Sequence, residues 1–310
     1  MKKILYTILA SISLTACAHA PAGGDTDNVM IAETETGAVR VVWMGTAGLY
    51  VTDGETGLYI DPFVSRYGLL KVGLGFGLNP EHDLIDKWIK ITGGAGASAV
   101  LVGHSHYDHA MDAPYFAART GAVIAGSEST ANVARGAGLP EEKIRVIADG
   151  KQMAIGKFTA AFIKSVHSPA LFGRIPWQGE ITEPLRPPVS ASAYREGGTY
   201  AIVLAHPKGT LLHYGSAGIK LGSLDNVSAD VVFLSLGGRK DTPSLLTHVV
   251  TPVHAARVIP IHFDDFFAPL DARFSHLIGV NMEEFQRSMA ESPEIGVSFP
   301  PIGRETILFQ

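Results

Sequence analysis

The sequence predicts a layered α/β fold in which two mixed sheets lie between helices. Short apolar runs typical of strands alternate with amphipathic segments typical of helices, and this alternation occurs in both halves of the chain. The chain has 310 residues, of which 46% are hydrophobic and 18% are charged, so it can bury a large core. Because no short repeat or linker-like stretch interrupts residues 38–310, we expect them to form one domain.

The first half of this domain begins with an expected antiparallel meander. Strands are expected at Val39–Trp43, Gly48–Thr52 and Leu58–Ile60, with Gly-Thr and Asp-Gly turn signals between them. The glycine-rich segment 66–80 is either a mobile flap or a plain connecting loop. The further elements expected in this half are helices at 83–91, 110–119 and 127–135, and strands at 99–102, 122–125, 144–147, 152–155 and 158–166.

The second half repeats the mixture of strands and helices. Residues 200–205 and 210–214 are expected to form a hairpin across Pro207-Lys208-Gly209. The remaining expected elements are strands at 231–236 and 258–261 and helices at 243–256 and 282–290.

The N-terminus resembles a bacterial lipoprotein signal. Lys2 and Lys3 precede an apolar stretch that is too short to span a bilayer comfortably. The residues Leu-Thr-Ala-Cys that end at Cys17 resemble a lipobox, which implies a signal peptide at 1–16, lipidation of Cys17 and a flexible tether at 17–37. An ordinary secretory signal with an incidental cysteine is the open alternative. The resemblance implies an outer-membrane anchor that faces the periplasm, because Ala18 stands where aspartate marks inner-membrane retention.

The charge balance argues against a nucleic-acid partner. Removal of residues 1–16 takes away two of the 25 basic residues and leaves 23 against 30 acidic ones. The chain has no basic block, and its single cysteine leaves neither a disulfide nor a thiolate metal ligand for the domain. The expected partner is a small-molecule or lipid substrate, and the sequence does not specify an oligomeric state.

The segment His104–His109 predicts a metal site. It places three imidazoles and one carboxylate within six positions, directly after the apolar run Ala99–Val102. Neutral imidazole and carboxylate are ligands that Zn²⁺ prefers, and thiolate is not required. The alternative is a polar loop with chance histidines, but the spacing is dense for that interpretation.

The pattern His-x-His-x-Asp-His at residues 104–109 resembles the signature of the metallo-β-lactamase superfamily. Three further positions match that family: Asp61 after an early strand, His167 in a later segment, and His262 after a short buried strand. The resemblance spans about residues 39–265. It implies a four-layer αββα sandwich of the metallo-β-lactamase type, in which two mixed sheets are flanked by helices.

The resemblance also implies a ligand set and a cofactor. The implied ligands are His104, His106 and His167, here called the first group, and Asp108, His109 and His262, called the second group. Asp61 is implied to orient a ligand imidazole, although a turn-forming Asp-Pro is an alternative interpretation. The expected cofactor is Zn²⁺, two ions per chain, with Mn²⁺ and Fe²⁺ as other candidates.

One position departs from the family pattern. An aspartate that bridges both metals usually lies between the last two histidines, but here the turn reads Gly215-Ser216-Ala217-Gly218. A serine hydroxyl brings no negative charge, so the site keeps roughly one more positive charge than its relatives. Two outcomes are open, a single bound ion or two. We favour two because all six other ligands are present.

The ligand set implies hydrolysis by a zinc-bound hydroxide, formed from water whose pKa is pulled toward ~7. Asp108 is expected to orient that nucleophile and Ser216 to assist at the developing oxyanion. Tyr107 either assists there or packs as a ring beside the site. His213 is expected to lie behind the ligands.

Substrate contacts are expected in the segments that follow His167 and His262, which are rich in aromatic residues. The candidate contacts are Tyr107, Phe172, Arg174, Trp177 and Asp265. Surface packing is an equally open interpretation of these positions.

The run Gly45–Leu49, continuing to Asp61-Pro62, is similar to the branch that contains L-ascorbate-6-phosphate lactonase and N-acyl-phosphatidylethanolamine phospholipase D. That similarity implies cleavage of an ester, lactone or phosphodiester. The alternatives are a periplasmic β-lactamase and a non-catalytic protein that holds metal. Redox use of iron is a third option, but relatives of that kind typically have glutamate where His106 stands.

Overall fold

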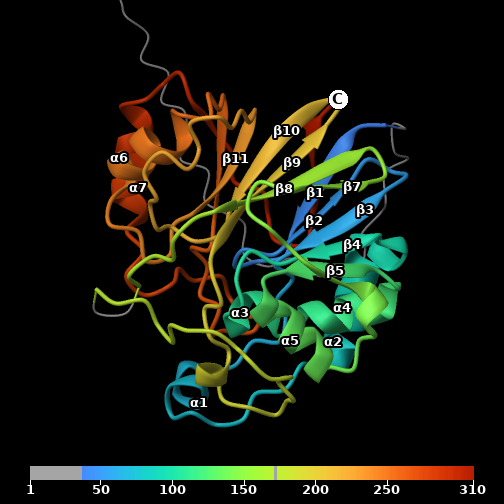
Figure 1. The fold of residues 1–310 in the computed structure, drawn as a ribbon. Coiled ribbons are helices and arrows are strands. Elements are labelled where there is room, and N and C mark those ends of the chain that lie inside the picture. Colours follow the sequence, from blue (N-terminus) through green and yellow to red (C-terminus); the bar gives the residue numbers. More distant parts are fainter. Residues whose placement is uncertain (1–36, 171–172) are drawn as a thin grey trace, which may run out of the picture.

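The computed structural model describes residues 37–170 and 173–310, and these residues form two mixed sheets with helices on their outer faces (Figure 1). The first sheet has the strand order β14-β1-β2-β3-β4-β5-β6, and the second has the order β13-β12-β11-β10-β9-β8-β7. The strands of the first sheet are β1 (Val39–Trp43), β2 (Leu49–Thr52), β3 (Gly57–Ile60), β4 (Ala99–Leu101), β5 (Val123–Gly126), β6 (Ile144–Val146) and β14 (Glu305–Phe309). Those of the second are β7 (Gln152–Ile155), β8 (Phe158–Lys164), β9 (Tyr200–His206), β10 (Gly209–Tyr214), β11 (Val231–Ser235), β12 (Arg257–Ile261) and β13 (Gly296–Val297).

The two sheets share one plan. From β14 to β3 and from β7 to β10 neighbouring strands are antiparallel, whereas from β3 to β6 and from β10 to β13 they are parallel. Parallel strands bring their carboxyl ends to the same edge of a sheet, which is where α/β proteins place functional side chains.

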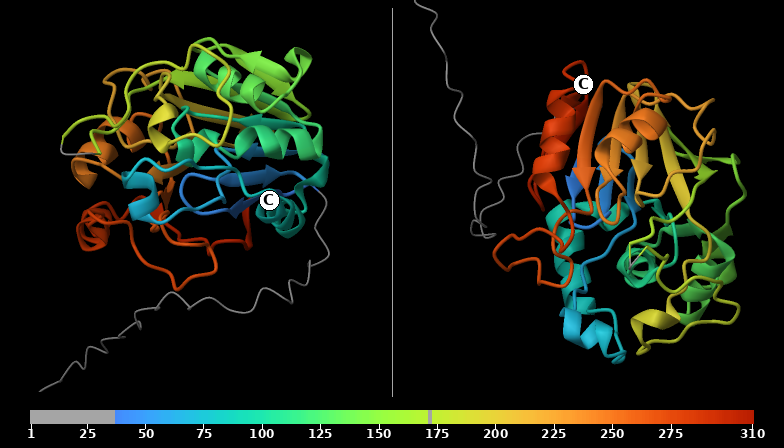
Figure 2. Two further views of the ribbon diagram at one scale, coloured as in Figure 1. Left: turned by 90° about the horizontal axis from the view of Figure 1, so that it is seen from below. Right: turned by 90° about the vertical axis from the view of Figure 1, so that its left-hand side faces the viewer.

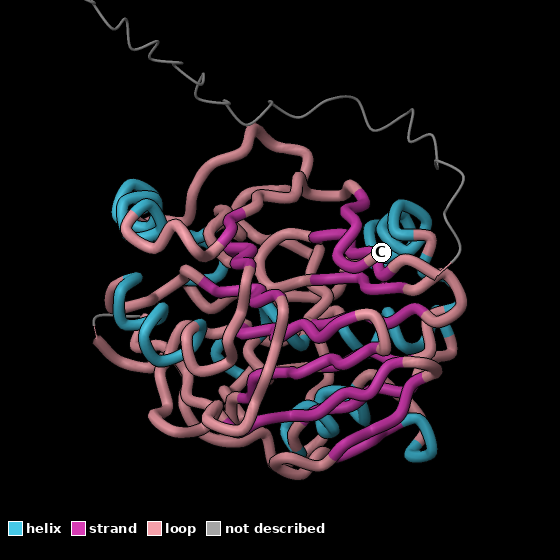
Figure 3. Tube along the Cα trace, turned by 90° about the horizontal axis from the view of Figure 1, so that it is seen from above, coloured by secondary structure: helices cyan, strands magenta, loops and turns pink. Residues whose placement is uncertain are grey.

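Helices cover the outer face of each sheet. The helices are α1 (Leu69–Gly73), α2 (His82–Thr92), α3 (Tyr107–Ala110), α4 (Ala113–Thr120), α5 (Glu128–Gly136), α6 (Thr242–Leu245) and α7 (Met282–Ala290); α6 continues as a π-helical turn at Leu246–Val250. Short 3₁₀ turns lie at Gly94–Gly96, Glu141–Lys143 and Ala191–Ala193. Helices α2, α4 and α5 pack on the first sheet and α6 and α7 on the second, so the strands gather in the middle of the molecule (Figure 3).

Side-chain alternation along β1 illustrates how the layers are held. Val41 and Trp43 point into the core between the sheets, and Val42 points to the opposite face, under the helices. A strand covered on both faces carries apolar residues on both, as β1 does at four of its five positions, and its remaining side chain, Arg40, is also buried. Together with the order of layers, this confirms the predicted α/β architecture of two mixed sheets flanked by helices.

The structure differs from the sequence prediction in several places, including a short helix, α1, in the glycine-rich segment and a two-residue strand, β13. The helix expected at 243–256 ends with the π-helical turn at Val250, and His254 lies in a turn with φ +57°. The helix expected at 110–119 is divided into α3 and α4, so the predicted metal motif itself includes a helical turn. Strand β14 was not expected, because residues 305–309 gain a partner only by pairing with β1, far away in sequence.

Within residues 37–170 and 173–310, every helix is too short or too polar to cross a bilayer. The predicted signal peptide, Cys17 and all of the predicted tether except residue 37 lie outside the described residues.

Candidate metal centre

The predicted ligands follow strands of both sheets at one common edge. Asp61 follows β3 and His104 follows β4, and these two strands are parallel neighbours in the first sheet. In the second sheet His167 follows β8 and His262 follows β12, and both strands run toward this edge. The fold thus brings together residues that lie up to about two hundred positions apart in the sequence.

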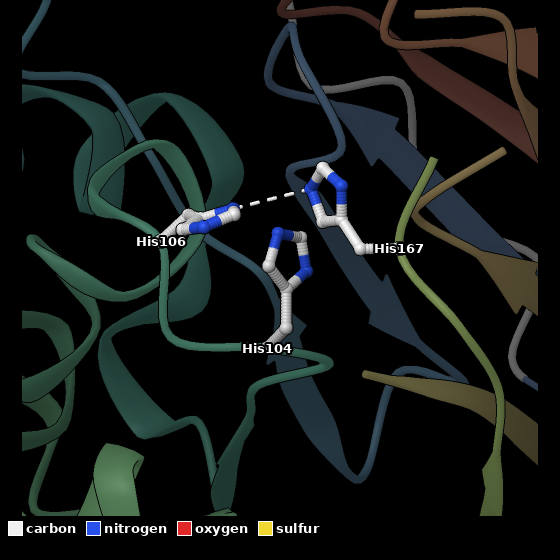
Figure 4. Close-up of side chains that lie close together, drawn as sticks. All are labelled: His104, His106 and His167. Atoms are coloured by element: carbon white, nitrogen blue, oxygen red, sulfur yellow. Dashed lines mark hydrogen bonds between the residues drawn. The ribbon is translucent and has the colours of Figure 1, made fainter. Parts of the chain in front are cut away.

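The three histidines of the first group converge on one point (Figure 4). Each offers a ring nitrogen, and these nitrogens all lie within 4.8 Å of one another. His106 Nδ1 and His167 Nε2 face each other at 3.1 Å. His104 is 2% exposed, and its Nε2 has no hydrogen-bond partner within the described part of the chain. A buried nitrogen that lacks a partner and faces two others has the environment of a metal ligand.

Hydrogen bonds on the far side of two rings fix which nitrogen faces inward. His106 Nε2 lies 2.9 Å from the carbonyl oxygen of Pro176, and His167 Nδ1 lies 2.7 Å from that of Ser168. A carbonyl can only accept, so each ring donates from that nitrogen and leaves the lone pair of the other nitrogen free. The free lone pairs are those of His106 Nδ1 and His167 Nε2, the atoms that face each other.

The second group is supported by a buried carboxylate. His109 Nδ1 donates to Asp61 Oδ2 at 2.9 Å, which leaves His109 Nε2 as the ligand atom. The other oxygen of Asp61 accepts from the backbone N–H of Gly103 at 2.7 Å. Asp108 Oδ2 lies 3.2 Å from His262 Nε2 and 3.6 Å from His109 Nε2. The two groups are adjacent, because the ring centroids of His104 and His109 are 3.8 Å apart.

Burial and neighbouring charges set the protonation of the ligands. Burial lowers the pKa of His106 to about 4 and of His167 to about 3, and it lowers the pKa of His104 well below its usual range. Burial opposes ionisation of Asp108, but His109 and His262 outweigh it and hold its pKa below the usual range. At neutral pH these groups are therefore in the forms that bind metal, neutral imidazole and ionised carboxylate.

Two residues of the site, Asp61 and His262, have strained backbone conformations. Asp61 has φ +44° and His262 has φ +54°, conformations that favour glycine. Each directly follows a strand, so the turn directs its side chain across the edge of the sheet. A left-handed backbone conformation in a residue other than glycine persists where surrounding contacts stabilise it. Such residues cluster at functional sites.

Those surrounding contacts come from residues that sequence reasoning did not assign to the site. The N–H of His262 donates to the carbonyl of Thr46 at 2.8 Å, and the N–H of Thr46 donates to Asp264 Oδ1 at 2.8 Å. The guanidinium of Arg66 forms a buried ion pair with Asp264 Oδ2 at 2.6 Å. The sequence signal for these contacts is weak, since Thr46 lies in the family-like run Gly45–Leu49 and Asp264 in a segment where only substrate contacts are expected.

Two further polar residues, His213 and Ser216, are predicted to lie near the ligands, and the structure shows their hydrogen bonds. His213 is fully buried, donates from Nε2 to the carbonyl of Ala47 at 2.8 Å, and has its Nδ1 3.9 Å from Asp61 Oδ2. Ser216 Oγ accepts a hydrogen bond from the N–H of Ser168 at 3.1 Å. Ser216 thus supports the residue after His167, and its catalytic role stays a prediction.

Two predicted aromatic residues, Trp177 and Tyr107, and one further residue, Phe266, form a wall beside both ligand groups. The Trp177 ring lies 6.0 Å from that of His106, and the Phe266 ring lies 5.2 Å from that of His262. Tyr107 packs between Trp177, Phe266 and Phe63, and it is 3% exposed. Its hydroxyl has no hydrogen-bond partner among the described residues. Phe266 is not among the predicted contacts, although it lies in the segment after His262 in which substrate contacts are expected.

The structure gives less support to the remaining predicted substrate contacts. Arg174 is exposed, and Asp265 is half-buried with Oδ1 accepting from the N–H of Phe267 at 3.0 Å. Phe172 lies outside the described residues. The roles of all three in substrate binding stay predictions.

The donor set of both groups fits divalent metal ions. The first group offers three imidazole nitrogens, and the second offers two imidazole nitrogens and one carboxylate oxygen. Such nitrogen and oxygen sets are typical of Zn²⁺ sites, and Fe²⁺ and Mn²⁺ also accept them.

Comparison with known proteins agrees with this chemistry. The family described as "Beta-lactamase superfamily domain" matches residues 40–262. A protein of Myxococcus xanthus named UPF0173 metal-dependent hydrolase is 25% identical over 278 residues, which cover 86% of this chain and 87% of that protein. A protein of the same name from Rhizobium leguminosarum is 26% identical over 132 residues, 43% of this chain, and the match spans about half (49%) of its length.

A solved structure shows the same fold. The metallo hydrolase Igni18 from the archaeon Ignicoccus hospitalis superposes with a TM-score of 0.57 and 16% identity, over 88% of this chain and 99% of that one. Because the family match covers most of the chain and includes every predicted metal ligand, the chain belongs to the metallo-β-lactamase superfamily, and its curated relatives are named metal-dependent hydrolases.

Proposed function

We propose that this protein is a hydrolase that binds Zn²⁺ at the first and second groups and cleaves an ester, lactone or phosphodiester. The observation that carries the proposal is the orientation of the imidazoles. His106, His167 and His109 each donate outward to a carbonyl or carboxylate, and each leaves a lone pair that faces the other ligands. Metal-binding histidines in proteins are oriented by this kind of outer hydrogen bond.

A bound zinc ion supplies Lewis acidity, which lowers the pKa of coordinated water and polarises the electrophile. The chain's own residues prepare the site for that chemistry. Asp108 is ionised and lies beside His262, so its carboxylate can accept a hydrogen bond from a water molecule and orient it. The apolar rings of Trp177 and Phe266 lie beside His106 and His262, and apolar surroundings strengthen electrostatic interactions at a site.

The reaction class rests on the relatives and on the early sequence motif. The relatives are named metal-dependent hydrolases, and Gly45–Leu49 with Asp61-Pro62 is similar to the lactonase and phospholipase D branch. We include the bacterial envelope in the proposal on the basis of the lipobox-like residues that end at Cys17. Incorporation of labelled palmitate into the full chain, and its loss in Cys17→Ser, tests that location.

Metal analysis followed by a substrate panel tests the activity. Protein purified without chelators is expected to contain zinc, and we favour two ions per chain over one. It should hydrolyse at least one member of a panel of esters, lactones, phosphodiesters and β-lactams, lose that activity after chelation, and regain it with Zn²⁺. Turnover of none of them by fully metal-loaded protein would favour a non-catalytic metal-binding protein instead.

A further inference from the structure

Four large apolar side chains are exposed on one short segment around α1. Leu69, Leu70, Leu74 and Phe76, here called the apolar tip, have exposed fractions of 49%, 78%, 70% and 58%. No other stretch of eight residues in the described chain contains more than two exposed large apolar side chains. Four within eight positions form a patch, and patches of this kind mark interaction sites.

The side chains of the apolar tip are not core residues that lack a packing partner. Val72 is 6% exposed and packs with Phe63 and Tyr107, so the inward side of α1 is already buried. Added Cβ atoms at Gly68, Gly73 and Gly75 would meet no atom within 4 Å. The segment is therefore anchored through one side chain and surrounded by open space. Figures 1 and 2 show α1 at one end of the molecule, away from the sheets.

The exposed apolar area of the tip is small for a stable protein interface and is sufficient for contact with a lipid surface. At roughly 200 Å² for each side chain, the four exposed fractions sum to about 500 Å². A stable protein interface covers about 800 Å² on each partner, usually with shape complementarity across a flat or concave surface. A small convex tip needs no complementary shape to enter the boundary between head groups and acyl chains of a bilayer.

The charge of the segment also favours a lipid bilayer as the partner of the apolar tip. Residues 67–80 contain one charged side chain, Lys71, and no carboxylate. The Lys71 ammonium lies 3.8 Å from the centroid of the Tyr67 ring, at the base of the tip. A cation and a tyrosine beside exposed leucines are the composition found at the interface of membranes that contain anionic lipids.

The apolar tip is continuous with the wall of the metal centre. Val72 and Tyr107 belong to one apolar cluster, and Trp177 and Phe266 pack against that cluster. The last two rings contact His106 and His262. A membrane that receives the tip would therefore lie on the side of the molecule that carries the aromatic wall of the two ligand groups.

We propose that residues 69–76 insert into the surface of a phospholipid bilayer and orient the metal centre toward it. This docking is independent of hydrolysis, so its failure and that of the proposed activity are separate outcomes. It is also distinct from the predicted lipid anchor at Cys17, which would tether the chain without orienting the domain.

A tryptophan placed in the segment reports insertion directly. In the full chain, Phe76→Trp should be quenched by brominated phospholipids in vesicles of phosphatidylcholine and phosphatidylglycerol, beyond the quenching of the unmodified chain. The matched control is Phe299→Trp, because Phe299 is 48% exposed and lies outside the segment. Equal quenching of both, or of neither while the chain is bound to vesicles, would overturn the proposal. Chelation of metal should leave the result unchanged.

A second pair of variants tests the energetic contribution. Leu70→Asp combined with Leu74→Asp should weaken vesicle binding about ten-fold or more in matched full chains. The control combines Leu221→Asp with Ile278→Asp, which alters leucine and isoleucine side chains that are 71% and 81% exposed. An equal loss in both pairs would contradict docking through the apolar tip. Sedimentation showing lipid-free self-association that Leu70→Asp with Leu74→Asp abolishes would reassign the surface to a second copy of the chain.

Discussion

The two ligand groups use similar side chains but are supported in different ways. In the first group, His106 and His167 donate to the neutral carbonyls of Pro176 and Ser168. In the second, His109 donates to the buried carboxylate of Asp61, and Asp108 is itself a ligand. The first group would therefore bind a cation without any negatively charged ligand, whereas the second would bind it with one carboxylate as a ligand and another behind a ligand.

This difference determines how each group responds to protons and to charge. Burial lowers the pKa values of His106 and His167. Burial also acts to lower that of His109, but Asp61 and Asp108 outweigh it and raise its pKa above the usual range. Carboxylate support strengthens an imidazole ligand and also makes it easier to protonate. The following predictions test this contrast, from the largest expected effect to the smallest.

Loss of a ligand from the first group should have the largest effect. His106→Ala is expected to lower kcat/KM at least about a hundred-fold, because even groups that only support a metal ligand contribute 10–100-fold. Metal content should fall by one ion per chain if two are bound. His248→Ala is the control, since His248 is exposed on the π-helical turn. Retained activity in His106→Ala would remove the first group from the mechanism.

Replacement of the supporting carboxylate should weaken mainly the second group. In Asp61→Asn, the amide oxygen can keep the bond from Gly103 while its NH₂ faces His109 Nδ1. The ring proton then moves to Nε2 and blocks the lone pair that faces the metal. Zinc affinity of the second group should fall about 10–100-fold in a competition titration, with little change at the first.

The control for Asp61→Asn is another buried carboxylate. Asp112 accepts from the backbone N–H groups of Val64 and Ser65 at 2.7 and 2.8 Å and contacts no ligand. Asp112→Asn should leave zinc affinity unchanged. If Asp61→Asn weakened both groups equally, the contrast between them would be wrong.

Acidification should lower the zinc affinity of the second group more than that of the first. A protonated imidazole cannot bind metal, so affinity falls as the pH drops below the pKa of a ligand histidine. For His109 that fall begins above the ordinary histidine value of about 6.5, whereas for His106 and His167 it begins near pH 4 and pH 3. Zinc titrations at pH 7 and pH 5 should show about a ten-fold loss per pH unit at the second group only. Parallel loss at both groups would show that their proton affinities are alike.

Restoration of a bridging charge should have the smallest effect. Ser216→Asp is expected to increase affinity for the second ion by up to about ten-fold, because it adds a carboxylate between two cations. The new side chain retains an acceptor for the N–H of Ser168. Ser216→Asn is the uncharged control. An unchanged stoichiometry and affinity in Ser216→Asp would mean that residue 216 does not face the ions.

Much of the site could be predicted because its signals are local. The density of histidines at 104–109 and the apolar runs before Asp61, His167 and His262 indicate strand ends that carry polar side chains. The positions of Arg66 and Asp264 could not be predicted in this way. Their ion pair joins residues 198 positions apart, and nothing in either neighbourhood specifies the partner.

The sequence by itself determined the layered fold, the types of ligand side chain and the presence of a serine at position 216, where the family resemblance predicts a bridging aspartate. Hydrophobic periodicity and residue chemistry are properties of short segments, so they can be read without coordinates. Only the tertiary structure decided which nitrogens of His106, His167 and His109 face the other ligands, that His109 is the imidazole that Asp61 supports, and that the apolar tip stays uncovered. These features depend on which distant backbone carbonyls, carboxylates and side chains are packed together, and that is a property of the folded chain.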